Sequence, residues 1–341
     1  MTVAICGTIA WTVLDRRRLE YRRLYSWVSL FLRFCLACQM ILYGLAKVIP
    51  LQMQFPSLTR LLERYGNFSL MGVLWSSVGA SPPYETFVGC AELVAGVLLF
   101  FPRTSLLGLI ICLFDLIEVF TLNMTYDVPV KLFSFHLIVL TCFLLVPDAR
   151  RLSDLLIFNR PIGPGRPAPL FASIRANRMA VWAQVAFGLL LLLGHLNALR
   201  ENWFRYGGGR PKSGLYGIWN VEAMTFDAKP RPLSLAPSDA KLWRRIVFER
   251  PDTMSAECMD ESLQTFRSAI DSKAKTISLT LQGNTKWRAT LNSARRSRDT
   301  MTLDGLVDGH QLHLDLRAVD LSKFLLLSSR FHWIQEYPFN R

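Results

Sequence analysis

The sequence predicts a bundle of about five or six transmembrane helices followed by an antiparallel, barrel-like β domain. Long apolar runs dominate the first 200 of the 341 residues. After Gly214 charged residues recur every few positions, and no further long apolar run appears. The glycine-rich stretch Tyr206–Gly214 between the two halves cannot hold a helix. We therefore expect a membrane domain over residues 1–200, a linker over 201–214 and a β domain over 215–341.

Five apolar segments predict the spanning helices, because a spanning helix needs about 20 mostly apolar residues. Prolines lie at the segment ends, where the missing backbone donor of proline costs least. The five segments are Trp27–Ile49, Thr86–Phe101, Ser105–Leu122, Val130–Val146 and Met179–Leu199.

Two further apolar stretches are too short to span. Ser69–Ala80 predicts an interfacial or re-entrant piece. Met1–Leu14 would reach about 20 Å as a helix, and its arginines follow the apolar run, whereas a signal peptide begins with positive charge. We interpret Met1–Leu14 as the tail of a membrane helix whose upstream part is missing from the sequence.

Arginine clusters predict the orientation of the bundle. The segment Asp15–Arg23 holds five arginines, the segment Asp148–Arg178 holds six against two aspartates, and Arg103 flanks a third loop. Counting helices places all three on one face, which the positive-inside rule makes cytoplasmic. We therefore expect an inner-membrane protein whose C-terminal domain is extracytoplasmic.

The net charge of +13 does not indicate nucleic-acid binding. The charge lies in short clusters that flank apolar runs, and the sequence has no continuous basic face and no nucleic-acid-binding motif. We expect the lipid bilayer, and no nucleic acid, as a partner. Six of the seven cysteines lie in apolar runs and only Cys258 lies in the C-terminal domain, which must therefore fold without an internal disulfide.

Three short motifs lie within residues 27–147, and a fourth begins at the end of this stretch: Gly44-Leu-Ala-Lys47, Glu92-Leu-Val-Ala-Gly96, Tyr126-Asp-Val-Pro-Val-Lys131 and Pro147-Asp-Ala-Arg-Arg151. In these motifs the chain resembles the DoxX-like family of small four-helix membrane proteins. The last two resemble a subgroup with an appended C-terminal domain. Some members of the family resemble subunits of thiosulfate:quinone oxidoreductases, so the resemblance implies a quinone and a redox partner subunit. The chain departs from the family in its leading segment, fifth helix, C-terminal domain, Asp115 and Glu118.

Nine short runs after Tyr216 predict an up-and-down antiparallel barrel or a curved meander, because alternating runs at hairpin spacing indicate half-buried strands. Gly283-Asn284 and Asp308-Gly309 are turn pairs. The runs are Ile218–Phe226, Leu242–Glu249, Thr253–Met259, Gln264–Ile270, Thr276–Gln282, Trp287–Leu291, Thr300–Leu303, Gln311–Val319 and Phe324–Ser329.

Gly217-Ile-Trp219 at the start of the first strand is similar to the opening motif of lipocalins. That resemblance implies that an arginine, here Arg330, covers the tryptophan. A barrel of this size is either filled by its own side chains or holds one small ligand. We favour the packed interior.

Ionisable residues within or beside the apolar runs are the candidate site. Each costs at least about 2.5 kcal/mol at the centre of the bilayer, so such residues are usually paired and face inward. Counted along their helices, they fall in the outer half of the membrane. They predict either structural pairing or a polar pocket that opens outward, centred on Lys47 and Glu92 and able to bind a quinone carbonyl or relay a proton. The candidates are Lys47, Glu92, Asp115, Glu118 and His136, with Asp127 and Lys131 paired at the mouth.

Two other patterns carry a weaker signal for chemistry. Cys35 and Cys38 lie three apart inside an apolar helix, where we expect small residues at a helix contact rather than a redox pair. The histidines show no metal-binding spacing, and His310 and His313 would face opposite sides of a strand, so we expect no metal site.

Three functions remain open from the sequence. We favour a DoxX-like accessory or anchor subunit associated with quinone and redox chemistry. The second is a membrane oxidoreductase in its own right, using the buried acids and His136. The third is a non-catalytic transporter or envelope scaffold whose outer domain binds partners.

Overall fold

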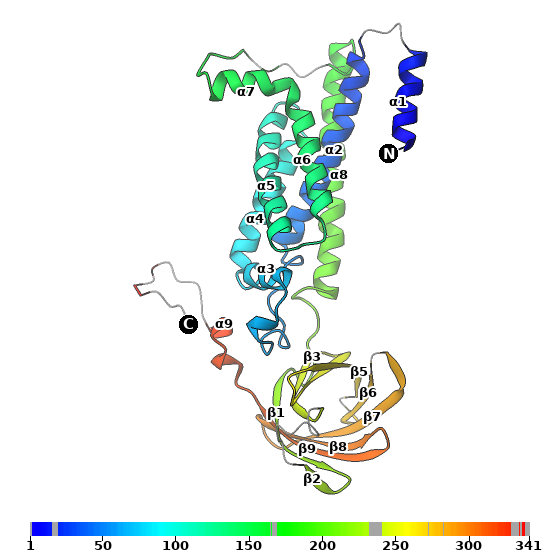
Figure 1. Ribbon diagram of the computed structural model, residues 1–341, viewed down its shortest axis with the longest axis vertical. Helices are drawn as coiled ribbons and strands as arrows, with labels where there is room; N and C mark the ends of the chain where they lie inside the picture. Colours follow the sequence, from blue (N-terminus) through cyan, green and yellow to red (C-terminus); the bar gives the residue numbers. More distant parts are fainter. Residues whose placement is uncertain are drawn as a thin grey trace. The chain divides into compact units, whose positions relative to one another are not determined.

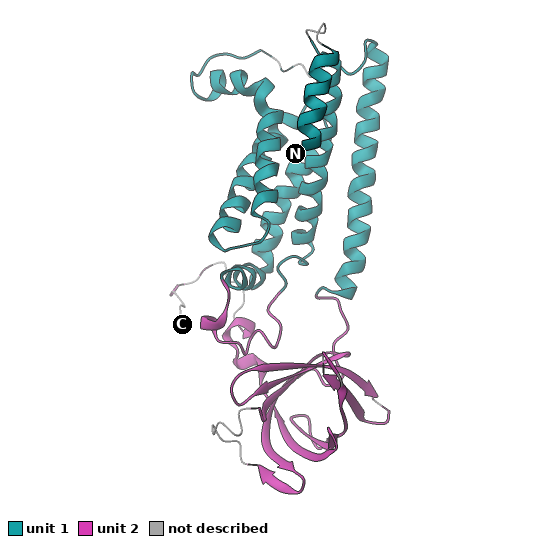
Figure 2. Cartoon of the chain, turned by 45° about the vertical axis from the view of Figure 1, so that its right-hand side comes forward, with its two compact units in different colours: residues 1–54, 70–207 teal, residues 55–69, 208–341 magenta. Residues whose placement is uncertain are grey.

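The computed structural model describes residues 2–15, 20–163, 165, 169–231, 241–271, 273–281, 283–328, 334 and 336–337. The chain folds into two compact units (Figure 2). The helical unit comprises Met1–Gln54 and Leu70–Gly207, and the β unit comprises Phe55–Ser69 and Gly208–Arg341. The predicted fold class, apolar helices followed by a closed antiparallel barrel, is confirmed.

The described residues of the helical unit form eight α-helices, which Figure 1 labels α1 to α8. By length and composition, four stretches of the described chain are long and apolar enough to cross a membrane: α2, α5, the run from α6 into α7, and α8. α4 has 17 residues and is about 26 Å long, slightly short of the 30 Å hydrocarbon core. The helices are α1 (Thr2–Leu14), α2 (Arg22–Val48), α3 (Leu70–Gly79), α4 (Pro82–Leu98), α5 (Ser105–Thr125), α6 (Lys131–Leu145), α7 (Ala149–Leu156) and α8 (Ile174–Arg205).

The helix bounds differ from the sequence prediction chiefly at α8. This helix begins at Ile174 rather than Met179 and continues to Arg205, so it includes residues 201–205 of the expected linker. The predicted interfacial piece is α3, whose ten residues reach only about 15 Å.

The four helices α2, α4, α5 and α6 pack side by side in a ring (Figure 1). Their core includes Leu36, Ile41, Leu99 and Cys112, all of which are fully buried. α8 packs against α2 from outside the ring and buries only Gln184, Gly188 and Leu199 among its described residues. The ring therefore provides the interior of the unit, and α8 is a peripheral helix.

The barrel closes because β1 pairs with both β3 and β9 in an antiparallel sheet of sequential neighbours. Its strands are β1 (Gly217–Phe226), β2 (Lys229–Arg231), β3 (Trp243–Arg250), β4 (Thr253–Cys258), β5 (Leu263–Asp271), β6 (Thr276–Leu281), β7 (Asn284–Arg295), β8 (Thr300–Val307) and β9 (His310–Ala318). Eight of the nine predicted runs are strands of this barrel.

The ninth prediction was wrong and one strand was not predicted. The described part of the predicted run Phe324–Ser329, which ends at Ser328, is not a strand: residues Leu321–Lys323 form a 3₁₀ turn and Leu325–Ser328 form α9, because the closed barrel leaves no ladder for this segment to join. β2 was missed because Lys-Pro-Arg has no apolar alternation. It forms because Asp227 and Ala228 both have positive φ, which gives the two-residue hairpin turn that matches strand twist.

Large apolar side chains fill the described interior of the barrel, in agreement with the packed interior that the sequence analysis favoured. Trp219, Phe248, Met254 and Phe266 are each at most 2% exposed within one cluster. The Trp219 indole donates a hydrogen bond from Nε1 to the Leu215 carbonyl at 3.0 Å. The Arg295 guanidinium lies 5.7 Å from the Trp219 ring centroid, whereas the predicted cover, Arg330, lies outside the described residues.

A segment from the helical half belongs to the β unit. Residues 55–69 connect α2 to α3, and Leu58 packs against Ile218 and Val247 on the outer face of the barrel. Ile218 and Val247 are ladder partners whose side chains alternate with the inward-facing Trp219. Without the segment, this outward apolar patch would be exposed. The predicted domain boundaries of 1–200 and 215–341 left residues 55–69 in the membrane domain. The sequence of 55–69 has no strand or helix periodicity that would have assigned it to the β unit.

Candidate functional site

Glycines bring α2 and α4 into backbone contact. A Cβ atom added at Gly89 would lie 2.7 Å from the Gly44 carbonyl oxygen and 2.7 Å from the Lys47 Cβ. One added at Gly44 would lie 2.6 Å from the Leu93 backbone nitrogen. No larger residue fits at either position without separating the helices. The close crossing fixes the relative position of the two helices at this point.

The face of α4 at this crossing alternates glycine with glutamate. Glu85, Gly89, Glu92 and Gly96 are spaced by four, three and four residues, and all are buried. This spacing places them on one helix face. The Gly-x-x-Lys and Glu-Leu-x-x-Gly motifs thus have one structural explanation. The glycines permit backbone contact between α2 and α4, and Lys47 and Glu92 meet about one helical turn from that contact.

Lys47 and Glu92 form an ion pair inside the bundle. The Lys47 ammonium donates to Glu92 Oε1, and the two residues are only 6% and 3% exposed. Lys47 Cβ lies beside Gly89, three residues or about 4.5 Å along α4 from Glu92. The lysine therefore extends from the end of α2 towards the middle of the bundle. The pairing with Glu92 determines this direction.

Glu85 is a buried acid that the sequence prediction missed. The residue is fully buried, and its Oε1 accepts a hydrogen bond from the Met53 amide at 2.9 Å. Gly79, at the end of α3, also packs against the Met53 carbonyl, so this contact fixes the turn after α2. The signal that could have found it is the seven-residue spacing from Glu92, which is two helical turns.

Two acids of α5 approach the ion pair. Asp115 is half-buried and Glu118 is exposed, and both line the same cavity as Lys47 and Glu92. Neither acid has an ion-pair partner among the described residues. The Asp115 Oδ2 atom is buried and accepts no hydrogen bond from the described part of the chain. An unpaired buried carboxylate is costly, so Asp115 requires a proton or an external donor.

The cavity between these helices has a volume of about 300 Å³. Polar groups lie on several sides of it, and the rest of its surface is apolar or aromatic. Its residues come from α2, α3, α4, α5, α6 and the connections between them. Besides the four ionisable residues, the lining includes Gln39, Tyr43, Gln52, Trp75, Tyr84, Asn123, Phe133 and Ser134.

Three of the seven predicted site residues lie elsewhere. Asp127 and Lys131 form the expected ion pair, at the turn between α5 and α6, but neither lines the cavity. His136 is exposed on the outer face of α6, where its Nδ1 contacts the Leu132 carbonyl. The structure therefore brings together Lys47, Glu92, Asp115 and Glu118, and separates His136 from them.

The other sequence candidates contribute no second centre. The seven cysteines are free, and Cys38 Sγ lies 3.8 Å from His195 Nε2 at the contact of α2 with α8. Arg33 donates a hydrogen bond to Gln184 at the same contact. Within the described ranges, no group of three His, Cys, Asp or Glu side chains could hold a metal ion.

Comparison with known proteins gives one informative match. No protein-family model matches the chain, and no solved structure matches it. The uncharacterized protein YwoB of Bacillus subtilis is 34% identical over 119 residues, which are 35% of this chain and 75% of that protein. The similarity covers three quarters of YwoB, and the chain belongs to the same family as YwoB.

Proposed function

We propose that the chain is a DoxX-like multi-pass protein of the inner membrane that binds a quinone in the cavity and serves as an accessory or anchor subunit for a redox partner. The observation that carries the proposal is the buried Lys47–Glu92 pair, with Asp115 and Glu118 beside it on one cavity. Ionisable residues held inside a helical bundle commonly mark ligand or proton sites.

The charges of the cavity favour a ligand that exchanges hydrogen bonds with acids. Among the described residues that line the cavity, the three acids Glu92, Asp115 and Glu118 accompany one cation, Lys47. Glu92 Oε2, Asp115 Oδ2 and Gln52 Oε1 are buried without hydrogen bonds from the described residues. A protonated carboxyl group donates to a quinone carbonyl, and a carboxylate accepts from a quinol hydroxyl. Both forms of a quinone ring therefore have partners at this site.

The size of the cavity favours a head group rather than a whole lipid. Small-molecule sites range from about 300 to 1,000 Å³, and the cavity lies at the lower limit. A ring with its polar substituents fits such a volume, while an isoprenoid tail would extend between the helices into the bilayer. The aromatic residues Tyr43, Trp75 and Phe133 supply apolar surface for the ring.

Chain connectivity supports an extracytoplasmic β unit. The chain leaves the helical unit after Gln54, contributes residues 55–69 to the β unit, returns at Leu70 and leaves finally after Gly207. The barrel with residues 55–69 is one folded unit, and the chain enters it from the end of α2 and again from the end of α8, so these two helix ends belong on the side of the membrane that holds the barrel. The arginines Arg22, Arg23, Arg175 and Arg178 lie at the opposite ends of these helices, which the positive-inside rule makes cytoplasmic.

The test is the small-molecule content of the purified protein. The full chain is extracted in mild detergent, and bound quinone is quantified by mass spectrometry for wild type, Glu92→Gln and His136→Ala. His136 is the matched control because it lies in the bundle but outside the cavity. We expect bound quinone in wild type and His136→Ala and its loss in Glu92→Gln. Absence of quinone from wild type, or its retention in Glu92→Gln, would refute the proposal.

The accessory role has a separate test. Affinity purification of the tagged full chain should recover a redox subunit, and the subunit should remain bound to Glu92→Gln, whose outer surface is unchanged. Quinone binding without such a subunit would favour a membrane oxidoreductase in its own right.

A further inference from the structure

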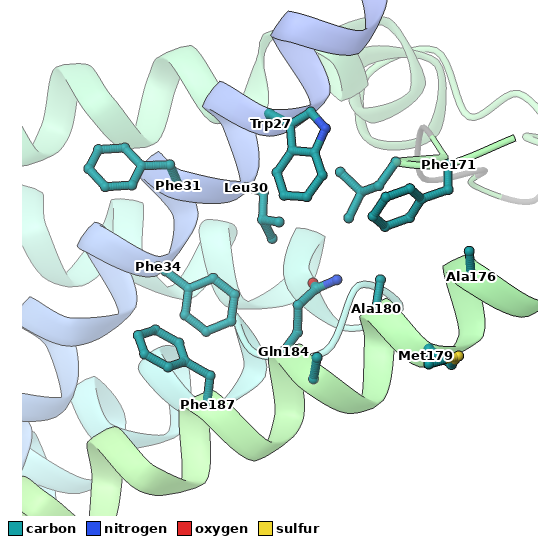
Figure 3. Close-up of a pocket in the computed structure, with 12 residues that line it drawn as sticks. Trp27, Leu30, Phe31, Phe34, Phe171, Ala176, Met179, Ala180, Gln184 and Phe187 are labelled. Atoms are coloured by element: carbon teal, nitrogen blue, oxygen red, sulfur yellow. The ribbon is translucent and has the colours of Figure 1, made fainter.

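A second hollow lies between α2 and α8, away from the polar cavity. It has a volume of about 670 Å³, and Figure 3 shows the side chains that line it. Its lining is apolar or aromatic except for Gln184. Two aromatic pairs line the hollow at different levels. The ring centroids of Trp27 and Phe171 are 5.7 Å apart in an edge-to-face arrangement, and those of Phe34 and Phe187 are 5.4 Å apart.

Small residues of α8 create this groove. Ala176, Ala180 and Ala183 follow one another at spacings of four and three, on the face that also carries Phe187. From Ala176 to Phe187 the groove extends about 16 Å along α8. The hydrocarbon part of one leaflet is about 15 Å thick, half of a 30 Å core. The groove therefore has the length of an acyl chain within one leaflet.

One end of the groove is strongly basic. α2 and α8 run in parallel, since Arg33 contacts Gln184 and Cys38 contacts His195 further along both helices. The first turns of both helices therefore lie at the same end. Arg23, Arg175 and Arg178 are exposed there, and none forms an ion pair within the described part of the chain. Free arginines beside an apolar groove between helices complement an anionic lipid head group.

We propose that this groove binds one acyl chain of an anionic phospholipid whose head group lies on Arg23, Arg175 and Arg178. The site is separate from the polar cavity and does not depend on quinone binding. The competing occupant is α1 of the same chain, which is apolar and buries none of its described residues. The arginines favour the phospholipid over α1, because the lipid head group is anionic whereas α1 carries no acidic residue to pair with them.

The test uses the full chain, purified and incubated with mixed micelles of phosphatidylglycerol or phosphatidylcholine, with bound lipid counted by native mass spectrometry. Ala180→Trp fills the groove, and Ala186→Trp is the matched control on an exposed position of α8 outside it. We expect wild type and Ala186→Trp to retain one phosphatidylglycerol in preference to phosphatidylcholine, and Ala180→Trp to lose it.

A second variant keeps the proposal testable if Ala180→Trp does not fold. Arg175→Gln with Arg178→Gln should reduce the preference for phosphatidylglycerol about 30-fold, at about fivefold per arginine. Arg103→Gln, at the exposed connection between α4 and α5, should leave the preference unchanged. Equal binding of both lipids to wild type would overturn the proposal. So would higher lipid binding after deletion of residues 2–14, which would identify α1 as the occupant.

Discussion

Gly89→Ala should separate α2 from α4 and weaken the ion pair that their contact supports. The added methyl would lie 2.7 Å from the Gly44 carbonyl oxygen, the Lys47 Cβ and the Val48 nitrogen, whereas ordinary contacts begin at 3.4 Å. None of these atoms belongs to a flexible side-chain end, so the helices must move apart by about 0.7 Å. A gap of that size forfeits about a quarter to a half of each contact energy along the interface. Overpacking of this kind costs about 1–3 kcal/mol.

The assay is thermal unfolding of the full chain in detergent, with bound quinone measured on the same samples. Gly194→Ala is the matched control, because Gly194 lies inside α8 and a Cβ there meets nothing within 4 Å. We expect Gly89→Ala to unfold at a lower temperature and retain less quinone, and Gly194→Ala to resemble wild type. If the two variants unfold at the same temperature, backbone contact between α2 and α4 does not hold the site together.

Four further outcomes follow from individual side chains. Lys47→Met leaves Glu92 buried without a cation and should cost about 3–5 kcal/mol, while Lys47→Met with Glu92→Leu should recover most of that loss in detergent unfolding. Trp219→Ala should cost about 3–5 kcal/mol and lower the melting temperature of the barrel by calorimetry; an unchanged melting temperature would contradict its place in the core. The hydrogen bond that the His313 ring donates to the Asp304 carboxylate raises the pKa of His313, so the stabilisation from this pair should be full below about pH 6.5 and fall as pH rises through the raised pKa. His313→Gln should therefore flatten the melting temperature between about pH 6 and 8, and an identical pH profile would refute the pairing. A phosphatase fused after Arg341 should be active and one fused after Arg166 inactive, and the reverse pattern would refute the orientation.

Periodicity predicted most of the architecture because it reports burial directly. The apolar runs correspond to α2, α4, α5, α6 and α8, and the alternating runs correspond to eight strands. Within the site, counting residues along the helices put Asp115 and Glu118 at a depth similar to that of Lys47 and Glu92, and in the structure all four line one cavity.

Depth alone does not determine which way a side chain faces. His136 was expected in the pocket from its depth, yet the buried stripe of α6 passes through Ser134, Leu137 and Thr141. His136 falls between these positions and therefore faces away from the helical ring. The same stripe, read from the sequence at a period of 3.6, would have corrected the prediction.

Long-range contacts were the other source of error. The packing of residues 55–69 on the barrel depends on Leu58 meeting Ile218 and Val247, which lie about 160–190 positions away in the sequence. No local pattern reports such a contact. The burial of Glu85 likewise depends on its bond to the Met53 amide, which only the folded turn supplies.

Photolabelling of the protein with an azido-quinone, followed by peptide mapping, tests most directly whether the polar cavity binds a quinone. We expect label on peptides from α4 and α5 that contain Glu92, Asp115 and Glu118, with protection by excess unlabelled quinone. Glu92→Gln should lose this label, and His136→Ala should keep it. Label confined to the outer face of α6 or to the groove between α2 and α8, or label that excess quinone does not reduce, would contradict a quinone site in the polar cavity.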